Sequence, residues 1–115
     1  MEHLNKMAGV FKAFGDVNRL KIIKMLASDM AGELCVSDIA EKLGITQPAT
    51  SQHIKILKHI GVLFEDKIGF RVYYHINNEI LEVLQAEIND LYKKAYEKCS
   101  HDYACSECSF NNKCL

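Results

Sequence analysis

The sequence lacks any long hydrophobic run. No stretch of its 115 residues approaches the roughly 18 consecutive apolar residues that a membrane-spanning helix needs. The N-terminal segment MEHLNKMAGVFKAFG is amphipathic and charged, so it does not resemble the apolar core of a secretory signal. Internal repeats, low-complexity tracts and long linkers are also missing. We therefore expect a cytoplasmic protein with no membrane partner.

The sequence also lacks the motifs of common enzyme classes. It has neither a phosphate-binding glycine loop nor a nucleophile elbow. The segment Cys105-Ser106-Glu107-Cys108 lies in a C-terminal tail, whereas a thiol oxidoreductase carries such a motif at the start of a helix that follows a strand. We expect that the chain is not an enzyme.

With 49% hydrophobic residues, the chain suits one domain with a modest core.

A strong net charge is absent as well. The formal net charge is −1, although nucleic-acid-binding domains are often strongly basic. The charges are unevenly distributed, because residues 45–76 carry four Lys or Arg against two Asp or Glu, while residues 77–115 carry four against seven. Positive charge is thus concentrated in the central part of the chain.

That central part contains the segment TQPATSQHIKILKHIG, residues 46–61, which predicts an amphipathic helix. Thr46 is the expected N-cap, Pro48 fits the first turn, and Gly61 can end the helix in a left-handed conformation. At about 100° per residue, six residues share an inward side: Ala49, His53, Ile54, Ile56, Leu57 and Ile60. We expect His53 to be a packed, hydrogen-bonded histidine rather than a residue that contacts bases.

The outward side of this helix carries amides, a hydroxyl and lysines but no carboxylate. These groups can hydrogen-bond to base edges and phosphates, which is typical of a helix that contacts DNA. An ordinary solvated surface helix shows the same pattern, so the neighbouring elements must decide between the two.

The preceding residues predict a helix-turn-helix. Helical spacing of apolar residues indicates a first helix over residues 2–14 and a second, capped by Asp16, that continues to about Ser28. Val17, Leu20, Ile23 and Leu26 are expected to face inward. A third helix, VSDIAEKL, is expected to be capped by Ser37 and to stop at Gly44, just before the amphipathic helix of residues 46–61.

The following residues predict a β-hairpin. Val62, Leu63 and Phe64 begin a strand, DKIG supplies the turn, and FRVYYHI alternates apolar and polar residues as a second strand. A hairpin directly after such a helix is the wing of a winged helix, and its basic residues can approach the minor groove or backbone. The predicted DNA contacts are Thr46, Gln47, Ser51, Gln52, Lys55, Lys58, Lys67 and Arg71.

A final helix is expected from Asn77 to Lys98, with an apolar stripe larger than a small winged helix can bury. We therefore predict a homodimer that uses the first and last helices and binds a palindromic operator in double-stranded DNA. The predicted fold is mainly α with a β-hairpin wing, a winged helix-turn-helix dimerised through its N- and C-terminal helices. Residues 1–98 would form the DNA-binding and dimerisation domain.

Residues 99–115 form a cysteine-rich tail. Cys99, Cys105, Cys108 and Cys114 have the spacing C-x5-C-x2-C-x5-C, in which the central pair can chelate one ion and the flanking pair can complete the shell. The tail has too few hydrophobic residues to fold by packing, so a bound metal would order it. Structural zinc, a sensor site for arsenite, cadmium or lead, an iron–sulfur cluster, and metal-free redox or persulfide sensing all remain open.

Residues 33–76, ELCVSDIAEKLGITQPATSQHIKILKHIGVLFEDKIGFRVYYHI, together with DVNRLKIIKML before them, resemble the ArsR/SmtB family of metal- and metalloid-responsive repressors. The resemblance covers roughly residues 8–95. It implies a dimeric winged-helix repressor that leaves its operator when an inducer binds.

The resemblance is incomplete at the expected inducer site. The arsenic, cadmium and lead branch of the family opens its third helix with E-L-C-V-C-D-L, whereas this chain has Ser37 in place of the second cysteine. The tail cysteines could complete a site that includes Cys35, although Cys35 alone could equally be a small buried residue. Residues 77–98 contain no histidine, so the zinc and nickel site that other members carry on the last helix has no counterpart.

Overall fold

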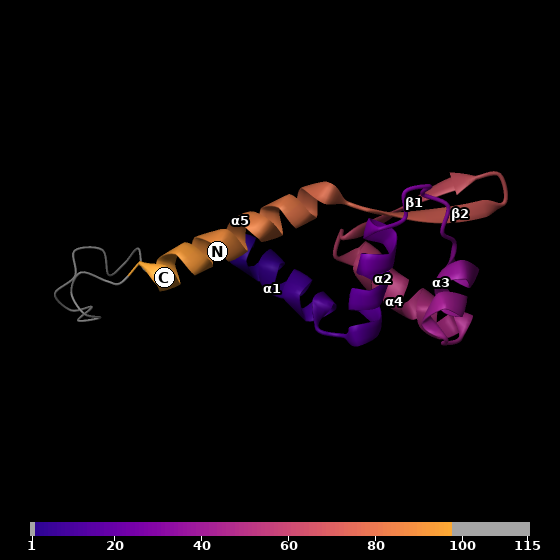
Figure 1. The fold of residues 1–115 in the computed structure, drawn as a ribbon, viewed down its shortest axis with the longest axis horizontal. Helices are drawn as coiled ribbons and strands as arrows, with labels where there is room; N and C mark the ends of the chain where they lie inside the picture. The colour runs from indigo at the N-terminus through magenta and orange to yellow at the C-terminus, as the bar shows by residue number, and fades with distance from the viewer. Residues whose placement is uncertain (1, 98–115) are drawn as a thin grey trace. The chain divides into compact units, whose positions relative to one another are not determined.

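The computed structural model describes residues 2–97, so the tail with Cys99, Cys105, Cys108 and Cys114 lies outside the described residues. Figure 1 shows the order of the elements: α1 (Glu2–Phe14), α2 (Val17–Ala27), α3 (Val36–Leu43), α4 (Gln47–His59), β1 (Leu63–Ile68), β2 (Arg71–Ile76) and α5 (Asn78–Tyr96). The predicted fold class, mainly helical with a two-stranded hairpin, is confirmed. Within the described residues, no helix combines the length and apolarity required to cross a bilayer.

The chain divides into two compact units, Met1–Glu82 and Val83–Leu115. The first contains α1 to α4, the hairpin and the start of α5. The second contains the rest of α5, in which Lys94 pairs with Asp90 and Tyr92 stacks on Tyr96. The predicted domain boundary at residue 98 lies outside the described residues.

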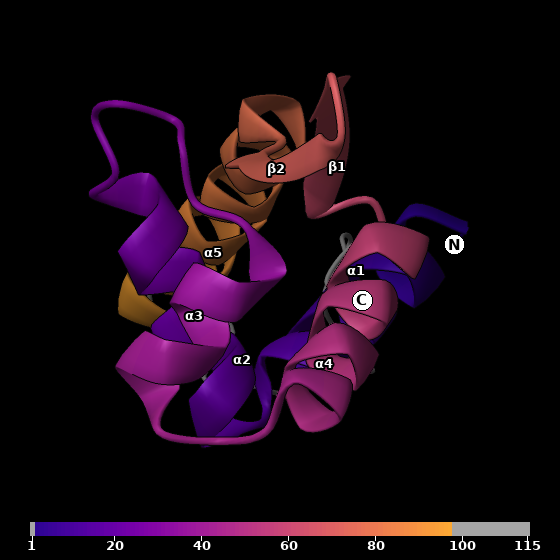
Figure 2. The same cartoon turned by 90° about the vertical axis from the view of Figure 1, so that its right-hand side faces the viewer.

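Two of the N-caps that the sequence predicts in the first unit, Asp16 for α2 and Thr46 for α4, are confirmed. The Asp16 carboxylate accepts the Arg19 N–H at 3.1 Å, and the Thr46 hydroxyl accepts the Ala49 N–H at 3.2 Å. Gly44 (φ +71°) and Gly61 (φ +87°) end α3 and α4 in the left-handed region that favours glycine. The turn between α3 and α4 is visible along the lower edge of Figure 2.

Replacing Thr46 with alanine should lower the free energy of unfolding by about 1 kcal/mol, because the Ala49 N–H loses its acceptor. Urea titration at neutral pH measures the change. Thr46→Ser retains the hydroxyl and should stay close to the parent protein, whereas an alanine variant of unchanged stability would contradict the capping role.

The core of the first unit is built from side chains on several elements. Fully buried residues include Val10, Ile22, Ile39, Thr50, Leu57 and Val62. The prediction for α2 is wrong at Val17 and Leu20, which are exposed. Ile23 and Leu26 are buried as expected, and Ile22 is buried as well. The side of α2 that packs is set by its neighbours β2, α1, α3 and α4, and a helical wheel of α2 alone does not contain that information.

The turn of the hairpin lies later than predicted. Ile68 pairs with Arg71, so Gly69 and Phe70 form a two-residue turn, while Asp66 to Ile68 belong to β1. The expected DKIG turn is therefore wrong. Gly69 has φ +63°, and two-residue hairpin turns require a positive φ at this first position.

Candidate nucleic-acid interface

The surface of α4 carries the first group of predicted DNA contacts. Thr46, Gln47, Ser51, Gln52 and Lys55 are all exposed. Beneath them, buried Thr50, Ile54 and Leu57 fix the helix in the core. Ile56 was expected to face inward but is 42% exposed. The resulting surface presents neutral hydrogen-bonding groups and one lysine, without a carboxylate from α4 itself.

Lys58, the last predicted contact on α4, is already paired. Its Nζ donates to Glu65 Oε2 on β1 at 2.8 Å, and the two side chains are only 37% and 31% exposed. This hydrogen bond and the positive charge of Lys58 hold the pKa of Glu65 below its ordinary value. Lys58 thus joins α4 to the hairpin, and its charge is partly neutralised before any DNA contact.

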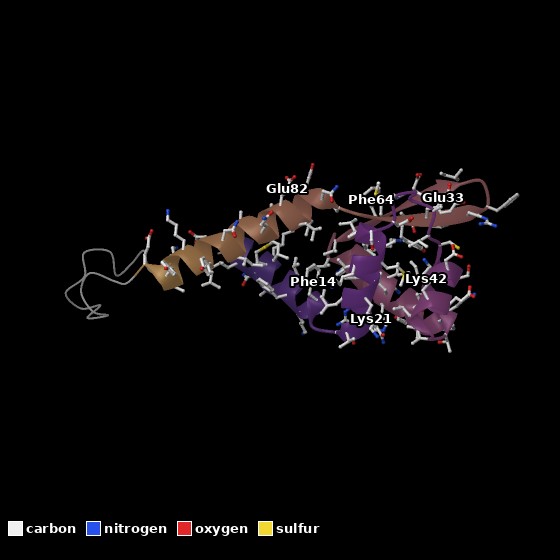
Figure 3. The ribbon with its side chains drawn as sticks, in the orientation of Figure 1. Phe14, Lys21, Glu33, Lys42, Phe64 and Glu82 are labelled. Atoms are coloured by element: carbon white, nitrogen blue, oxygen red, sulfur yellow. The ribbon has the colours of Figure 1, made fainter. Side chains whose placement is uncertain are left out.

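The hairpin supplies the remaining predicted contacts. Lys67 and Arg71 flank the turn and are exposed, and Lys67 Nζ lies 3.8 Å from Glu65 Oε1. Phe70 at the turn is fully exposed, and Ile68 beside it is mostly exposed. Phe64, labelled in Figure 3, is on the same hairpin and packs its ring against His75.

A polar cluster connects α4 to the start of α2. His53 Nδ1 lies 3.4 Å from Arg19 Nη1 and 3.9 Å from Asp16 Oδ1, and the His53 side chain is 18% exposed. The Arg19 N–H, followed by the charges of His53 and Arg19, keeps the pKa of Asp16 below its ordinary value. The prediction of a packed, hydrogen-bonded His53 is confirmed. Its partner Arg19 was missed because the two lie 34 residues apart in the sequence.

Cys35, rather than the expected Ser37, occupies the N-cap of α3. Its Sγ donates to Asp38 Oδ2 at 3.1 Å and lies 3.1 Å from Ser37 Oγ, and its backbone N–H also donates to Asp38. These hydrogen bonds, followed by the positive charge of Arg71, hold the pKa of Asp38 below its ordinary value.

The Cys35 side chain opens into a pocket of about 460 Å³ between α3 and the hairpin, lined also by Arg71 and Tyr74. The Tyr74 N–H donates to the Leu34 carbonyl at 3.2 Å and ties β2 to the residues before α3. Burial raises the pKa of the Tyr74 hydroxyl. Arg71 and Tyr74 of the hairpin therefore share one pocket with Cys35, the predicted sensor thiol.

The described residues alone do not suit a thiophilic ion. In residues 2–97, no three His, Cys, Asp or Glu side chains are grouped so as to hold a metal. Among the described residues, the side-chain groups that hydrogen-bond to the Cys35 thiol are the Ser37 hydroxyl and the Asp38 carboxylate, whereas soft metals and metalloids prefer several thiolates. Further thiolates would have to come from the tail, outside the described residues.

Comparison with known proteins identifies the family. The model of the arsR family of bacterial regulatory proteins matches residues 16–63, from the N-cap of α2 to the start of β1. An HTH-type transcriptional regulator of Methanocaldococcus jannaschii is 40% identical over 86 residues, which is 74% of this chain and 94% of the relative. The cadmium resistance transcriptional regulatory protein CadC of Listeria innocua is 40% identical over 84 residues, 72% of this chain and 69% of the relative.

The arsenical resistance operon repressor of Escherichia coli is 31% identical over 107 residues and covers 90% of each chain. The solution structure of a homodimeric winged helix-turn-helix DNA-binding domain from Mycobacterium bovis superposes with a TM-score of 0.62 at 31% identity, covering 85% of this chain and 88% of that one. These proteins are regulators of transcription and not enzymes. The chain belongs to the ArsR family of DNA-binding transcriptional regulators.

Proposed function

We propose that the protein is a homodimeric cytoplasmic repressor that leaves its operator when arsenite, cadmium or lead binds thiolates that include Cys35. The main support for a role of Cys35 is its position: it caps α3, donates a hydrogen bond to Asp38 and shares a pocket with Arg71 of the wing. Relatives named for arsenical and cadmium resistance support this class of inducer. An iron–sulfur cluster, a thiol-redox site or structural zinc is the alternative for the tail.

A homodimer is supported by apolar side chains that the isolated chain leaves exposed. On α1, Leu4 and Phe11 are each 48% exposed. On α5, Ile88, Leu91 and Tyr92 are exposed as well. Burial of both surfaces against a second copy would stabilise a two-fold dimer, in which two α4 helices can occupy major grooves about one DNA turn apart.

Release from DNA requires the inducer to bind the DNA-free dimer more tightly than the DNA-bound one. The chain's own residues suggest how the wing takes part. When Cys35 exchanges its proton for the inducer, Asp38 no longer accepts the thiol hydrogen bond, and its carboxylate, which already interacts with the positive charge of Arg71, becomes free to pair with that residue. The Arg71 guanidinium is drawn toward α3, which weakens its contact with the DNA phosphates.

The test is operator binding by the full chain, measured as fluorescence anisotropy without oxygen or chelator. Arsenite, cadmium and lead are titrated in turn, and the effective inducer should lower operator affinity by roughly two orders of magnitude. Cys35→Ser should bind the operator normally but lose this response. Ser37→Ala, which changes the neighbouring hydroxyl, should retain it. A Cys35→Ser protein that is still released would refute the role of Cys35.

Elemental analysis of protein purified without oxygen or chelator separates the alternatives for the tail. Iron with sulfide and a visible absorbance band would favour a cluster over a metalloid site. Zinc near one ion per chain would favour a structural site.

A further inference from the structure

A groove of about 520 Å³ runs between α1 and α4 within the first unit, apart from the Cys35 pocket. Its lining includes Lys12 of α1, Arg19 of α2, and Lys55 and His59 of α4. No aspartate or glutamate lines it. The groove thus presents basic side chains from three helices with no acidic side chain among them.

The floor of this groove is apolar. Gly9 lets α1 approach α4 closely, because a Cβ at this position would lie 2.9 Å from Ile60 Cδ1. Ala13 and Ile56 also line the groove, and Ile56 remains 42% exposed although it is a large aliphatic residue. The volume lies within the range of small-molecule sites, which are largely apolar with a few polar groups.

Most of the basic groups here are not used for internal contacts. The side chains of Lys12, Lys55 and His59 make no hydrogen bond or ion pair with any other described residue, whereas the Arg19 side chain contacts the Ala13 carbonyl and His53. The two lysines carry positive charges with no internal partner, which favours an anionic ligand. A phosphate or the DNA backbone would leave Ile56 uncovered, whereas a ligand with an anionic head and an alkyl body matches both the basic rim and the apolar floor.

We propose that this groove binds a long-chain fatty carboxylate, which acts as a second effector independent of the thiols. Its head would contact Lys12 and Lys55, and its chain would cover Ile56. Because Gln52 and Lys55 also belong to the predicted DNA-contacting surface, the bound carboxylate competes with the operator. The effect on DNA rests on the proposed function, but binding in the groove does not.

Calorimetry of the full chain with dodecanoate, kept below its micellar concentration, tests the binding directly. One saturable site per chain is expected, with much weaker binding of butyrate, which lacks the alkyl body, and of 1-dodecanol, which lacks the charge. Lys12→Gln and Ile56→Ser should each weaken dodecanoate binding about tenfold. Lys21→Gln is the matched control, since Lys21 is an exposed lysine of α2 outside the groove (Figure 3), and it should bind normally.

No saturable binding of dodecanoate would overturn the proposal, and so would binding that neither Lys12→Gln nor Ile56→Ser weakens. If Lys12→Gln weakens operator binding while dodecanoate fails to bind, the groove is a DNA-backbone surface instead. A second measurement tests the competition, since dodecanoate should release the operator from Cys35→Ser protein. If the parent protein binds no operator, the proposed function fails, whereas calorimetry still decides the carboxylate site.

Discussion

Replacing Lys55 with alanine is expected to weaken operator binding by about tenfold or more at physiological salt. Lys55 is exposed on α4 and has no internal partner among the described residues, so its whole charge is available to phosphate. Each lost phosphate contact removes about 0.9 counterions, and a dimer loses two contacts, so the slope of log affinity against log salt should become shallower by about 1.8. Titrations at several salt concentrations measure both effects.

Lys58→Ala is the matched control for this experiment. It removes the same charge from the same helix, but Lys58 is held by Glu65 at 2.8 Å. Its loss should change the salt slope less than the loss of Lys55 does. Equal changes in the two variants would contradict the assignment, because they would mean that the ion pair opens on DNA and that both lysines contact phosphate.

Replacing Leu57 with alanine should lower the free energy of unfolding by about 3 kcal/mol. Leu57 is fully buried on the inward side of α4, and Leu→Ala changes at such sites cost about 2–5 kcal/mol through lost transfer energy and the cavity left behind. Urea unfolding followed by circular dichroism measures the loss. Operator binding should fall with the folded fraction, since α4 is the helix that the core supports.

Ile56→Ala is the control in the adjacent position. Ile56 is 42% exposed, so its truncation leaves no buried cavity. The free energy of unfolding should fall by about 1 kcal/mol or less. Equal losses of stability in the two variants would contradict the orientation of α4, in which Leu57 faces the core and Ile56 faces outward.

The helical elements could be predicted because their signals are local. Thr46, Pro48 and Gly61 lie at positions that each specify one end of α4, and the structure has the helix at Gln47–His59. The same holds for Asp16 and Gly44 at the ends of α2 and α3. Each cap involves residues only a few positions apart, so it is visible in the sequence.

The hairpin turn was misplaced because two short signals competed. The polar pair Asp66 and Lys67 is typical of a turn, but pairing of Ile68 with Arg71 needs Gly69 at the first turn position. Strand register decides this, since a different turn would change every cross-strand pair. Phe70 consequently leaves the apolar face of the strand and is exposed at the turn.

By itself, the sequence determined the winged helix-turn-helix, the boundaries of α4 and the chemistry of its outward side, since periodicity and caps act within one element. Tertiary structure alone decided which of these groups are free. Lys58 pairs with Glu65 across two elements, His53 contacts Arg19 over a separation of 34 residues, and the groove is lined by Gly9 of α1 together with Ile60 at the end of α4. Such contacts depend on how helices and strands pack, which the pattern of a single element does not specify.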